Sequence, residues 1–403
     1  MSHRSPYLSQ LFAWLGHGYT HLLIALYLTV VLSLEKEWNL SYSELIELWT
    51  VGALLMGLGA PFAGWLGDRW STPGMMVVFF VGAGSATIGA GLSQSTLGLA
   101  VALSALGLFA SIYHPVGMSW LMRTALRPGF SVGVFGIFGC VGVASAGVIA
   151  DLLTHLISWR AAFIIPGAAS VATGAALALL RGGGWILDHK VDLKPLADAA
   201  PSRRDAMRAF WVLSLTVVCS GLIFSSTQTV MPKLFELRLG EYLTGGVFGA
   251  GTLFTVVYLA AGAFQIVGGW FADRFSLRAA YLIFFALQLP LLYLMGSLTG
   301  LPVIAVVLLM VLFNSGSQPA ENLLLTRYTP QRWRATAFGA KFVLAFGVTP
   351  LSVQLVGWIY GESGDFYWLF VILAGLAAAV VLAALLLPST APVPLRAQPV
   401  AAD

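Results

Sequence analysis

Residues 64–69, GWLGDR, form a short charged segment between two long apolar stretches. The segment returns 205 residues further on (64 to 269) as GWFADR at residues 269–274. Each copy follows one apolar stretch of helical length and precedes another. We expect such an acid–base pair at a membrane surface, because a charged residue costs about 2.5–3.5 kcal/mol at the centre of a bilayer. Two copies about half a chain apart indicate a duplicated membrane protein.

The composition supports a membrane protein. Apolar residues make up 58% of the chain and charged residues only 9%, whereas soluble domains carry about 25% charged residues. The basic residues are scattered among predicted loops, so the net charge of +4 does not indicate a nucleic-acid partner. Cys140 and Cys219 fall in apolar stretches without the spacing of a metal site or a disulfide framework. The first apolar stretch is too long for a signal peptide and is interpreted as the first span.

The apolar stretches predict an all-α membrane protein with twelve transmembrane helices. Their length and continuity exclude the short strands of a membrane barrel. The predicted spans are residues 8–34, 43–67, 73–93, 96–122, 130–153, 159–180, 209–234, 243–272, 277–298, 301–326, 334–360 and 365–387.

The pattern of charges predicts the domains and the orientation. Residues 181–208 contain three consecutive glycines and many charges, and we interpret them as a cytoplasmic linker between helical bundles at 1–180 and 209–388. Residues 389–403 are rich in alanine and proline and are expected to form a disordered tail. With both termini inside, sixteen lysines and arginines fall on the inner side and four on the outer side, which fits the positive-inside rule. The four outer ones are Lys36, Arg160, Lys233 and Arg238.

The duplication extends beyond the first motif. Residues 111–115 (SIYHP) match residues 315–319 (SGSQP) at an offset of 204, and Arg123 matches Arg327 at the same offset. The halves are therefore parallel repeats, an arrangement found in major facilitator transporters.

The segment at residues 64–69 resembles the signature loop between helices 2 and 3 of the major facilitator superfamily. The resemblance covers nearly the whole chain and implies two pseudo-symmetric six-helix bundles that rock about a central site. The family usually continues with glycine and two basic residues, where this chain has WSTPG at 70–74. Residues 21–23 (HLL) and 113–115 (YHP) are similar to the fosmidomycin-resistance-like branch of drug exporters. The glycine–proline signature of antiporters is absent from residues 142–147, which leaves export open.

The resemblance implies that the repeated motif acts as a conformational latch. Asp68 would dock on the start of helix 11 near Arg334, where the helix dipole favours a carboxylate, and Asp273 would dock on the start of helix 5. The alternative is that these charges only end a helix. The residues assigned to the latch are Gly64, Asp68, Arg69, Asp273 and Arg274.

Three histidines are predicted inside the membrane. His17 and His21 are four residues apart and share one face of helix 1, and His114 lies within helix 4 beside Tyr113. Ionisable groups at this depth usually face an aqueous cavity or the bundle interior, and histidine exchanges a proton at about pH 6–7. A proton or substrate pathway is therefore expected here. A histidine hydrogen-bonded to a carbonyl and a two-histidine metal site remain as alternatives, although no metal is predicted.

A second polar group is predicted in the later helices. Gln318, Glu321 and Asn322 share one stripe of helix 10, and Lys341 lies in helix 11. At 1.5 Å per residue, Glu321 and Lys341 both lie about 10 Å from the inner membrane surface, which predicts an ion pair. The pair could be structural, a proton-linked switch or an anchor for a charged substrate. Gln228 of helix 7 is a further candidate for lining the pathway.

We therefore expect a proton-coupled secondary transporter of a small molecule, with drug or metabolite efflux as one direction. An importer of an organic nutrient and a membrane sensor that does not transport remain alternatives. No phosphate-binding loop and no nucleophile–base arrangement is present, so no enzyme activity and no cofactor are expected. The expected setting is a monomer in a bacterial inner membrane, with both termini in the cytoplasm.

Overall fold

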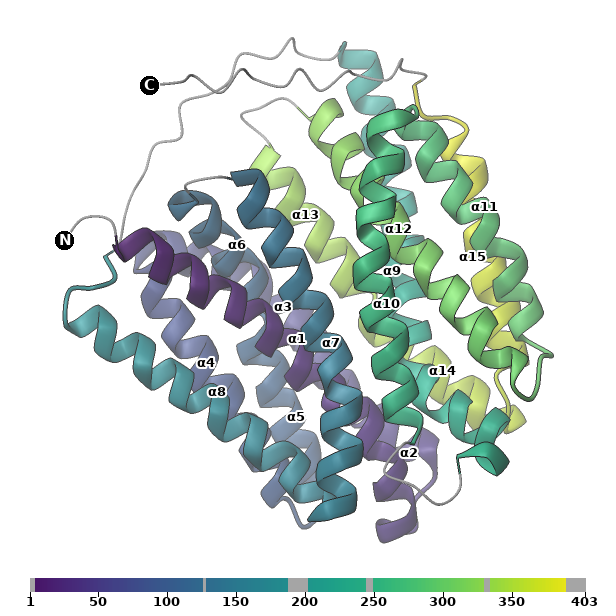
Figure 1. The fold of residues 1–403 in the computed structure, drawn as a ribbon, viewed down its shortest axis with the longest axis horizontal. Coiled ribbons are helices and arrows are strands. Elements are labelled where there is room, and N and C mark those ends of the chain that lie inside the picture. Colours follow the sequence, from purple (N-terminus) through teal and green to yellow (C-terminus); the bar gives the residue numbers. More distant parts are fainter. Residues whose placement is uncertain (1–3, 126–127, 188–201, 244–248, 330–333, 389–403) are drawn as a thin grey trace.

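A computed structural model describes residues 4–125, 128–187, 202–243, 249–329 and 334–388. These residues form helices and loops without a strand (Figure 1). Twelve spans within these ranges are long and apolar enough to cross a membrane, which confirms the predicted number. The elements are α1 Arg4–Trp38, α2 Tyr42–Glu47, α3 Thr50–Arg69, α4 Thr72–Leu92, α5 Thr96–Ala110, α6 Tyr113–Thr124, α7 Pro128–Leu156, α8 Trp159–Gly182, α9 Arg203–Leu239, η1 Gly240–Tyr242, α10 Ala250–Arg274, α11 Leu277–Met295, α12 Pro302–Tyr328, α13 Arg334–Gly347, α14 Thr349–Ser363 and α15 Tyr367–Ala384.

Three spans that were predicted as continuous are each divided into two helices. Between α5 and α6, Pro115 has no N–H to donate to the carbonyl of Ser111. The N–H of Ile112 donates to the carbonyl of Phe109, three residues earlier, and not to the carbonyl four residues earlier as in a regular α-helix. Between α13 and α14, Pro350 interrupts the ladder in the same way. Between α2 and α3 no proline is present; there the N–H groups of Leu48 and Trp49 donate to the carbonyls three residues earlier, and the carbonyl of Leu45 also accepts from the Tyr27 hydroxyl.

The predicted linker is shorter in the structure. Residues 203–208 belong to α9, because the Ser202 side chain accepts a hydrogen bond from the N–H of Asp205 and caps the helix. The charged composition of residues 203–208 suggested a loop, but charged residues are good helix formers once a helix projects from the membrane. Residues 188–201 and the predicted tail at 389–403 lie outside the described residues.

The helices form two bundles, α1–α8 (the N-terminal bundle) and α9–α15 (the C-terminal bundle), which lie side by side in Figure 1. Equivalent helices pack against each other in both bundles. In the N-terminal bundle α4 packs on α8, α3 on α5 and α1 on α7. The corresponding contacts in the C-terminal bundle are α11 on α15, α10 on α12 and α9 on α13 and α14. The contacts between the bundles repeat as well, with α7 against α10 and α3 against α13 and α14. This equivalence is the structural form of the sequence repeat.

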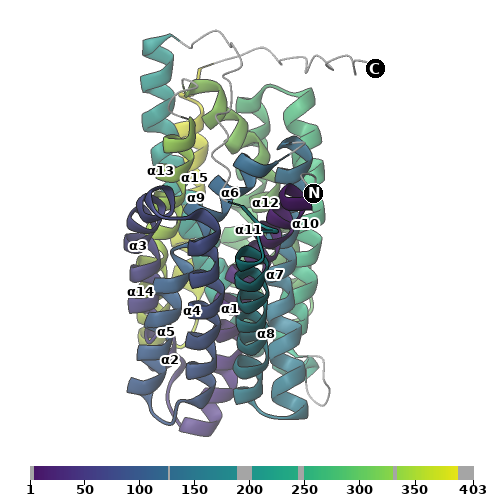
Figure 2. The same ribbon diagram turned by 90° about the vertical axis from the view of Figure 1, so that its left-hand side faces the viewer.

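The axes of the long helices are roughly aligned, so the molecule has two opposite ends (Figure 2). We call the end where α1 begins and α15 finishes the proximal end. The opposite end, where α1 finishes and α2 and α5 begin, is called the distal end (Figure 1).

Glycines set the closest helix contacts. A Cβ added at Gly107 of α5 would lie 1.9 Å from the carbonyl oxygen of Gly52 on α3, and one at Gly147 of α7 would lie 2.0 Å from that of Gly251 on α10. In a bilayer, lipid tails solvate apolar side chains as well as protein does, so helices associate mainly through close packing and hydrogen bonds. The fold therefore depends on small residues at these crossings.

Replacement of Gly107 by alanine is expected to lower the stability of the N-terminal bundle by about 1–3 kcal/mol, because the new methyl group collides with backbone that cannot give way. Gly375 of α15 is the matched control, since a Cβ there has no atom within 4 Å. Gly375→Ala should leave stability unchanged or raise it by up to about 1 kcal/mol. The midpoint of thermal unfolding in detergent measures both, and equal midpoints for the two variants would contradict the packing argument.

Candidate functional site

The three predicted histidines meet in the N-terminal bundle. The Nε2 atoms of His17 and His21 are 3.2 Å apart, and Nδ1 of His17 lies 2.6 Å from the carbonyl oxygen of Phe135 on α7. One ring nitrogen from each of His17, His21 and His114 falls within 4.8 Å of the other two. The structure thus brings together residues from α1 and α6 that the sequence placed on separate helices.

Aromatic rings enclose this histidine cluster, which comprises His17, His21 and His114. The ring of His17 stacks on Phe135 with centroids 3.7 Å apart. Tyr113 lies against His17 at 5.5 Å and donates its hydroxyl proton to the carbonyl of Ala13 at 2.5 Å, so its polar atom is used within the bundle. Tyr113 therefore positions the cluster.

His114 lies at the boundary between the bundles. Its ring stacks on Phe342 and Phe346 of α13, with centroids 5.2 and 4.5 Å apart. Its Nδ1 atom is buried without a hydrogen-bond partner among the described residues. A motion of α13 past α6 would therefore change the surroundings of the histidine cluster directly.

The predicted ion pair is confirmed in the C-terminal bundle. Lys341 Nζ lies 2.7 Å from Glu321 Oε1, and the two side chains are only 8% and 2% exposed. Lys341 also donates to Asn322 Oδ1 at 2.5 Å. The second carboxylate oxygen of Glu321 accepts from Tyr281 at 2.8 Å and from Ser220 at 3.4 Å. Four helices thus stabilise one buried carboxylate and one buried ammonium group.

Two other candidate residues have side chains without a hydrogen-bond partner among the described residues. The side chains of Gln228 on α9 and Gln318 on α12 are partly exposed and make no hydrogen bond with the part of the chain that the structure describes. Gln318 does not join Lys341, although it shares a helical stripe with Glu321 and Asn322. Both amides can still donate and accept hydrogen bonds.

The repeated motif has a clear packing role. A Cβ at Gly64 would lie 3.1 Å from Pro115, so this glycine lets α3 approach α6. The guanidinium of Arg69 lies 5.6 Å from the ring of Trp65, one helical turn earlier. Arg274 lies over Trp270 at 4.8 Å, so the second copy has the same cation–π contact.

The docking expected of the two aspartates is not part of this conformation. Asp68 forms its ion pair with Arg123, in its own bundle. Asp273 is exposed and makes no ion pair or hydrogen bond within the described ranges. Residues 330–333 and the side chain of Arg334, at the start of α13, lie outside those ranges. The latch therefore stays a prediction for another conformation.

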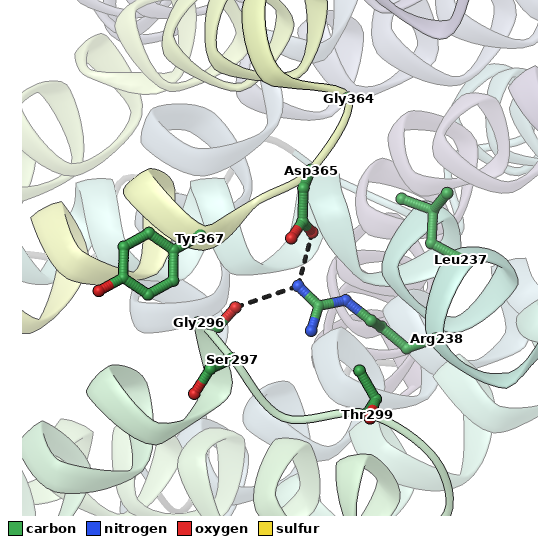
Figure 3. Close-up of a pocket in the computed structure, with 8 residues that line it drawn as sticks. All are labelled: Leu237, Arg238, Gly296, Ser297, Thr299, Gly364, Asp365 and Tyr367. Carbon is green, nitrogen blue, oxygen red and sulfur yellow. Dashed lines mark hydrogen bonds and ion pairs between the residues drawn. The ribbon is translucent and has the colours of Figure 1, made fainter.

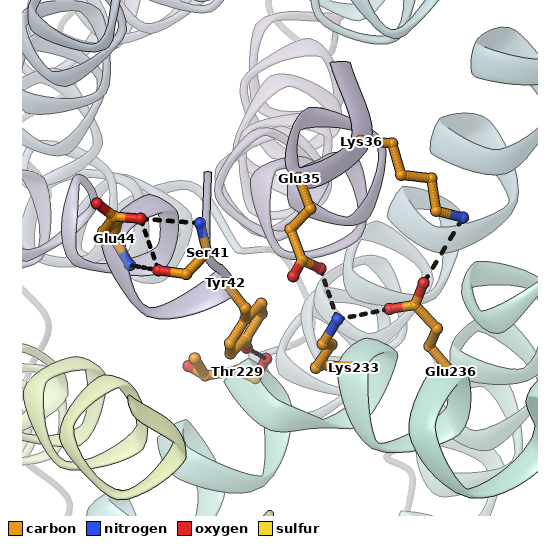
Figure 4. A network of polar contacts seen from close by, with 8 residues as sticks. All are labelled: Glu35, Lys36, Ser41, Tyr42, Glu44, Thr229, Lys233 and Glu236. Atoms are coloured by element: carbon orange, nitrogen blue, oxygen red, sulfur yellow. Dashed lines mark hydrogen bonds and ion pairs between the residues drawn. The ribbon is translucent and has the colours of Figure 1, made fainter. Parts of the chain in front are cut away.

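An ionic network that the sequence did not predict joins the bundles at the distal end (Figure 4). Lys233 of α9 donates to Glu35 of α1 at 2.7 Å and to Glu236 of its own helix at 2.9 Å. Glu236 also lies 3.7 Å from Lys36 of α1. Only their charge signals these residues in the sequence, because their partners come from the other half of the chain.

Hydrogen bonds extend this closure. Figure 4 shows Tyr42 of α2 donating to the carbonyl of Thr229 on α9, at 3.0 Å. Ser43 donates to the carbonyl of Gly357 on α14 at 2.9 Å. Among the described residues, no hydrogen bond or ion pair joins the bundles at the proximal end. In this conformation the bundles are therefore joined at the distal end and, where Gln265 of α10 donates to Cys140 Sγ of α7 at 3.3 Å, near the middle.

A surface pocket of about 500 Å³ lies within the C-terminal bundle at the distal end (Figure 3). Arg238 crosses it and donates to Asp365 at 2.5 Å and to the carbonyls of Gly296 and Leu298 at 3.1 and 2.6 Å. The guanidinium is thus used to join two loops. We interpret Arg238 as a structural residue.

A small cavity of about 10 Å³ lies deeper in the same bundle. Four of its lining side chains, Thr227, Tyr258, Gln288 and Asn314, each have a buried polar atom without a partner among the described residues. The volume suits one water molecule and excludes an organic substrate. Tyr258 and Gln288 were not predicted from the sequence, because single polar side chains occur in many apolar helices.

Comparison with known proteins identifies related sequences over nearly the whole chain. The family model described as Major Facilitator Superfamily matches residues 13–254 and 219–402. A gentisate transporter of Corynebacterium glutamicum is 26% identical over 396 residues, which cover 89% of this chain and 84% of that protein. A D-galactonate transporter of Escherichia coli O6:H1 is 30% identical over 193 residues, but these cover only 45% of this chain and 41% of that protein.

Solved structures support the same architecture. Crystal structures of a bacterial homologue of the human lysosomal transporter Spinster, inward-facing and unoccupied or occupied, superpose with TM-scores of 0.68 and 0.67. They cover 96% and 95% of this chain and 95% of the other chain in each case, at 15% and 17% sequence identity. At this identity the similarity concerns the fold alone.

These relatives do not support the expected likeness to the fosmidomycin-resistance-like branch. That likeness rested on residues 21–23 and 113–115. Three-residue matches are weak evidence in a chain of this kind, because apolar helices draw on a restricted set of residues.

Replacement of Lys233 by methionine is expected to open the distal end. It leaves Glu35 and Glu236 facing each other across the bundle boundary without their shared cation. Lys36→Met is the matched control, because the Lys36 side chain is 79% exposed and its ion pair with Glu236 is 3.7 Å long. Such surface pairs contribute about 0–1 kcal/mol.

Spin labels at Leu97→Cys and Leu301→Cys, both exposed at the distal end, measure the opening in a chain whose Cys140 and Cys219 are replaced by alanine. Lys233→Met should shift the distance distribution towards longer separations, while Lys36→Met should reproduce the parent. An unchanged distribution in Lys233→Met would show that the network does not hold the bundles together.

Proposed function

The chain belongs to the Major Facilitator Superfamily, and on that premise we propose that it is a proton-coupled transporter of an organic carboxylate. The family match and the related transporters make it an integral multi-pass membrane protein that moves a small molecule, and not an enzyme. The observation that carries the proposal is the buried pair of Lys341 and Glu321.

The substrate class follows from Lys341. Gentisate and galactonate, the substrates named for the two relatives, are both carboxylate anions. An ammonium group buried in a membrane protein needs a negative partner, and a substrate carboxylate can replace a protein carboxylate in that role. Lys341 lies next to Phe342, which contacts His114 of the other bundle, so the lysine is close to the boundary where a substrate would lie. Lys341 is the proposed anchor for the substrate.

Proton coupling follows from the competition for Lys341. When a proton neutralises Glu321, the carboxylate no longer holds the ammonium group, and Lys341 is free to bind the substrate anion. When the substrate leaves, Glu321 loses its proton and pairs with Lys341 again. The buried pair thereby avoids an unpaired charge in both states and makes proton and anion move together. Tyr281 and Ser220 can keep Glu321 in place in both states, because each hydroxyl can donate or accept a hydrogen bond.

Selectivity is assigned to polar groups around this pair. The unpaired amides of Gln228 and Gln318 are available to hydroxyl groups such as those of gentisate and galactonate. Asn322, which accepts from Lys341, is a further polar group beside the ammonium group. The histidine cluster lies across the boundary, where His114 meets Phe342.

The transport cycle in this proposal exchanges two closures. The present conformation is closed at the distal end through Lys233 and Tyr42. In the opposite conformation, Asp68 and Asp273 dock on the starts of α13 and α7 and close the proximal end. We place both termini in the cytoplasm of a bacterial inner-membrane protein that acts as a monomer, with residues 1–180 and 209–388 moving as the two units.

The direction proposed is uptake, since an inward proton gradient drives protons and anions inward together. Efflux, the other direction considered from the sequence, would need protons and substrate to compete for one site. Transport measured in vesicles with the pH gradient imposed in each direction separates the two. Accumulation of substrate against its gradient only when the inside is alkaline supports uptake with protons.

Single replacements Lys341→Met and Glu321→Gln test the pair. Each is expected to destabilise the protein by about 3–5 kcal/mol, because it leaves one buried charge unpaired or poorly paired. The double variant should recover most of that loss. A double variant no more stable than the worse single variant would show that the two side chains do not act as a pair.

Transport in proteoliposomes, with gentisate and galactonate as first probes, distinguishes the role of Lys341 in substrate binding from the role of Glu321 in proton coupling. Lys341→Met should lose both net uptake and exchange at least tenfold. Glu321→Gln should keep exchange of substrate across the membrane but lose accumulation driven by a pH gradient. Lys36→Met is the control and should retain both activities. Normal uptake in Lys341→Met would exclude this lysine as the substrate anchor.

A further inference from the structure

We propose that His17, His21 and His114 form a binding site for a divalent transition-metal ion, with Zn²⁺ as the test ion. The inference goes beyond the proposed transport of a carboxylate and does not depend on it. It rests on the arrangement of three imidazole rings from two helices, which neither the family match nor the relatives describe.

The spacing of the nitrogens fits metal ligation. Two nitrogens bound to a tetrahedral Zn²⁺ at about 2.05 Å lie about 3.3 Å apart. The Nε2 atoms of His17 and His21 are 3.2 Å apart, and a nitrogen of His114 completes a triangle whose sides are all within 4.8 Å. The longer sides have to shorten for all three rings to bind one ion.

The hydrogen bond of His17 prepares it as a ligand. A carbonyl oxygen only accepts, so Nδ1 of His17 carries the proton that is donated to Phe135 at 2.6 Å. In the neutral ring the lone pair is then on Nε2, which faces His21. Metal-binding histidines usually make this second contact, because it fixes both the tautomer and the orientation of the ring.

His114 supplies the second observation. Its Nδ1 atom is buried and has no hydrogen-bond partner among the described residues. A buried polar atom without a partner is unfavourable in free energy, and a bound ligand would remove that cost. A metal ion bound between the three rings would be coordinated by one ring nitrogen of His114.

The surrounding residues make room for the rings and hold them. A Cβ at Gly139 of α7 would lie 2.4 Å from Cε1 of His17, so only glycine allows the imidazole to occupy this position. Phe135 stacks on His17 at 3.7 Å, and Phe346 stacks on His114 at 4.5 Å. Ligands fixed by packing in this way lose little conformational entropy on binding.

The donor set indicates the kind of ion. Three neutral imidazoles suit Zn²⁺, Ni²⁺, Co²⁺ or Cu²⁺, whereas Mg²⁺ and Ca²⁺ require oxygen ligands. Among the described residues the group contains no carboxylate and no thiolate. Three histidines leave a fourth position open, as in zinc sites that bind an exchangeable ligand. In a low-dielectric interior that position would take an anion, a hydroxide or a carboxylate, since the three protein ligands do not reduce the charge of the ion.

Isothermal titration with ZnCl₂ tests the proposal on the full chain, purified in detergent, freed of any affinity tag and treated with a chelator. One Zn²⁺ per chain is expected. Co²⁺ should bind competitively and give the intense visible absorption of a tetrahedral site. No saturable binding of either ion would overturn the proposal without the use of a variant.

Single replacements of His17, His21 and His114 by glutamine should each weaken Zn²⁺ binding at least about 100-fold, beyond the range seen for loss of an outer contact. The matched control replaces the other three histidines of the chain, His3, His155 and His189, by glutamine together, and should bind like the parent. Thermal unfolding without metal confirms that each variant is folded. Parent-like affinity in all three single variants, or loss of binding in the control, would place the metal elsewhere.

Discussion

The rest of the structure depends on one constraint: a charged group within the membrane has to find its partner in the protein. Glu321 and Lys341 meet it most fully, since they pair at 2.7 Å and share hydrogen bonds with Tyr281, Ser220 and Asn322. Removal of one partner from such a pair is strongly destabilising. A pair of this kind is therefore stable while intact, and it responds to any proton or anion that competes for one member.

The duplication gives the molecule a symmetric frame with two different interiors. The helix contacts of the two bundles are equivalent, and so are the contacts between them, through α7 with α10 and α3 with α13 and α14. The polar groups do not follow this symmetry. The N-terminal bundle carries three histidines and the C-terminal bundle carries an ion pair, and Phe342 and Phe346 lie between them. Alternating access requires that the two bundles have equivalent helix contacts, whereas recognition of one small molecule requires that their interiors carry different polar groups.

Long-range contacts explain why part of the site could not be predicted. In a bilayer, hydropathy does not separate helix faces that meet lipid from faces that meet protein. Leu97 and Val101 are exposed on the same helix that buries Leu99 and Leu103, and no pattern of polarity distinguishes them. The rotation of each helix is therefore set by packing. For that reason the contacts of Lys233 with Glu35, and of Asp68 with Arg123, were not visible in the sequence.

The sequence by itself determined the twelve spans, the duplication and the pairing of Glu321 with Lys341, because hydropathy, repeat offset and depth along a helix are all local or one-dimensional quantities. It also placed His17 and His21 on one face of a helix. Only the tertiary structure decided that His114 joins them and that three spans break. The same holds for the closed distal end. Those features depend on which helix faces meet, and in lipid that is settled by close packing and by the hydrogen bonds that packing permits.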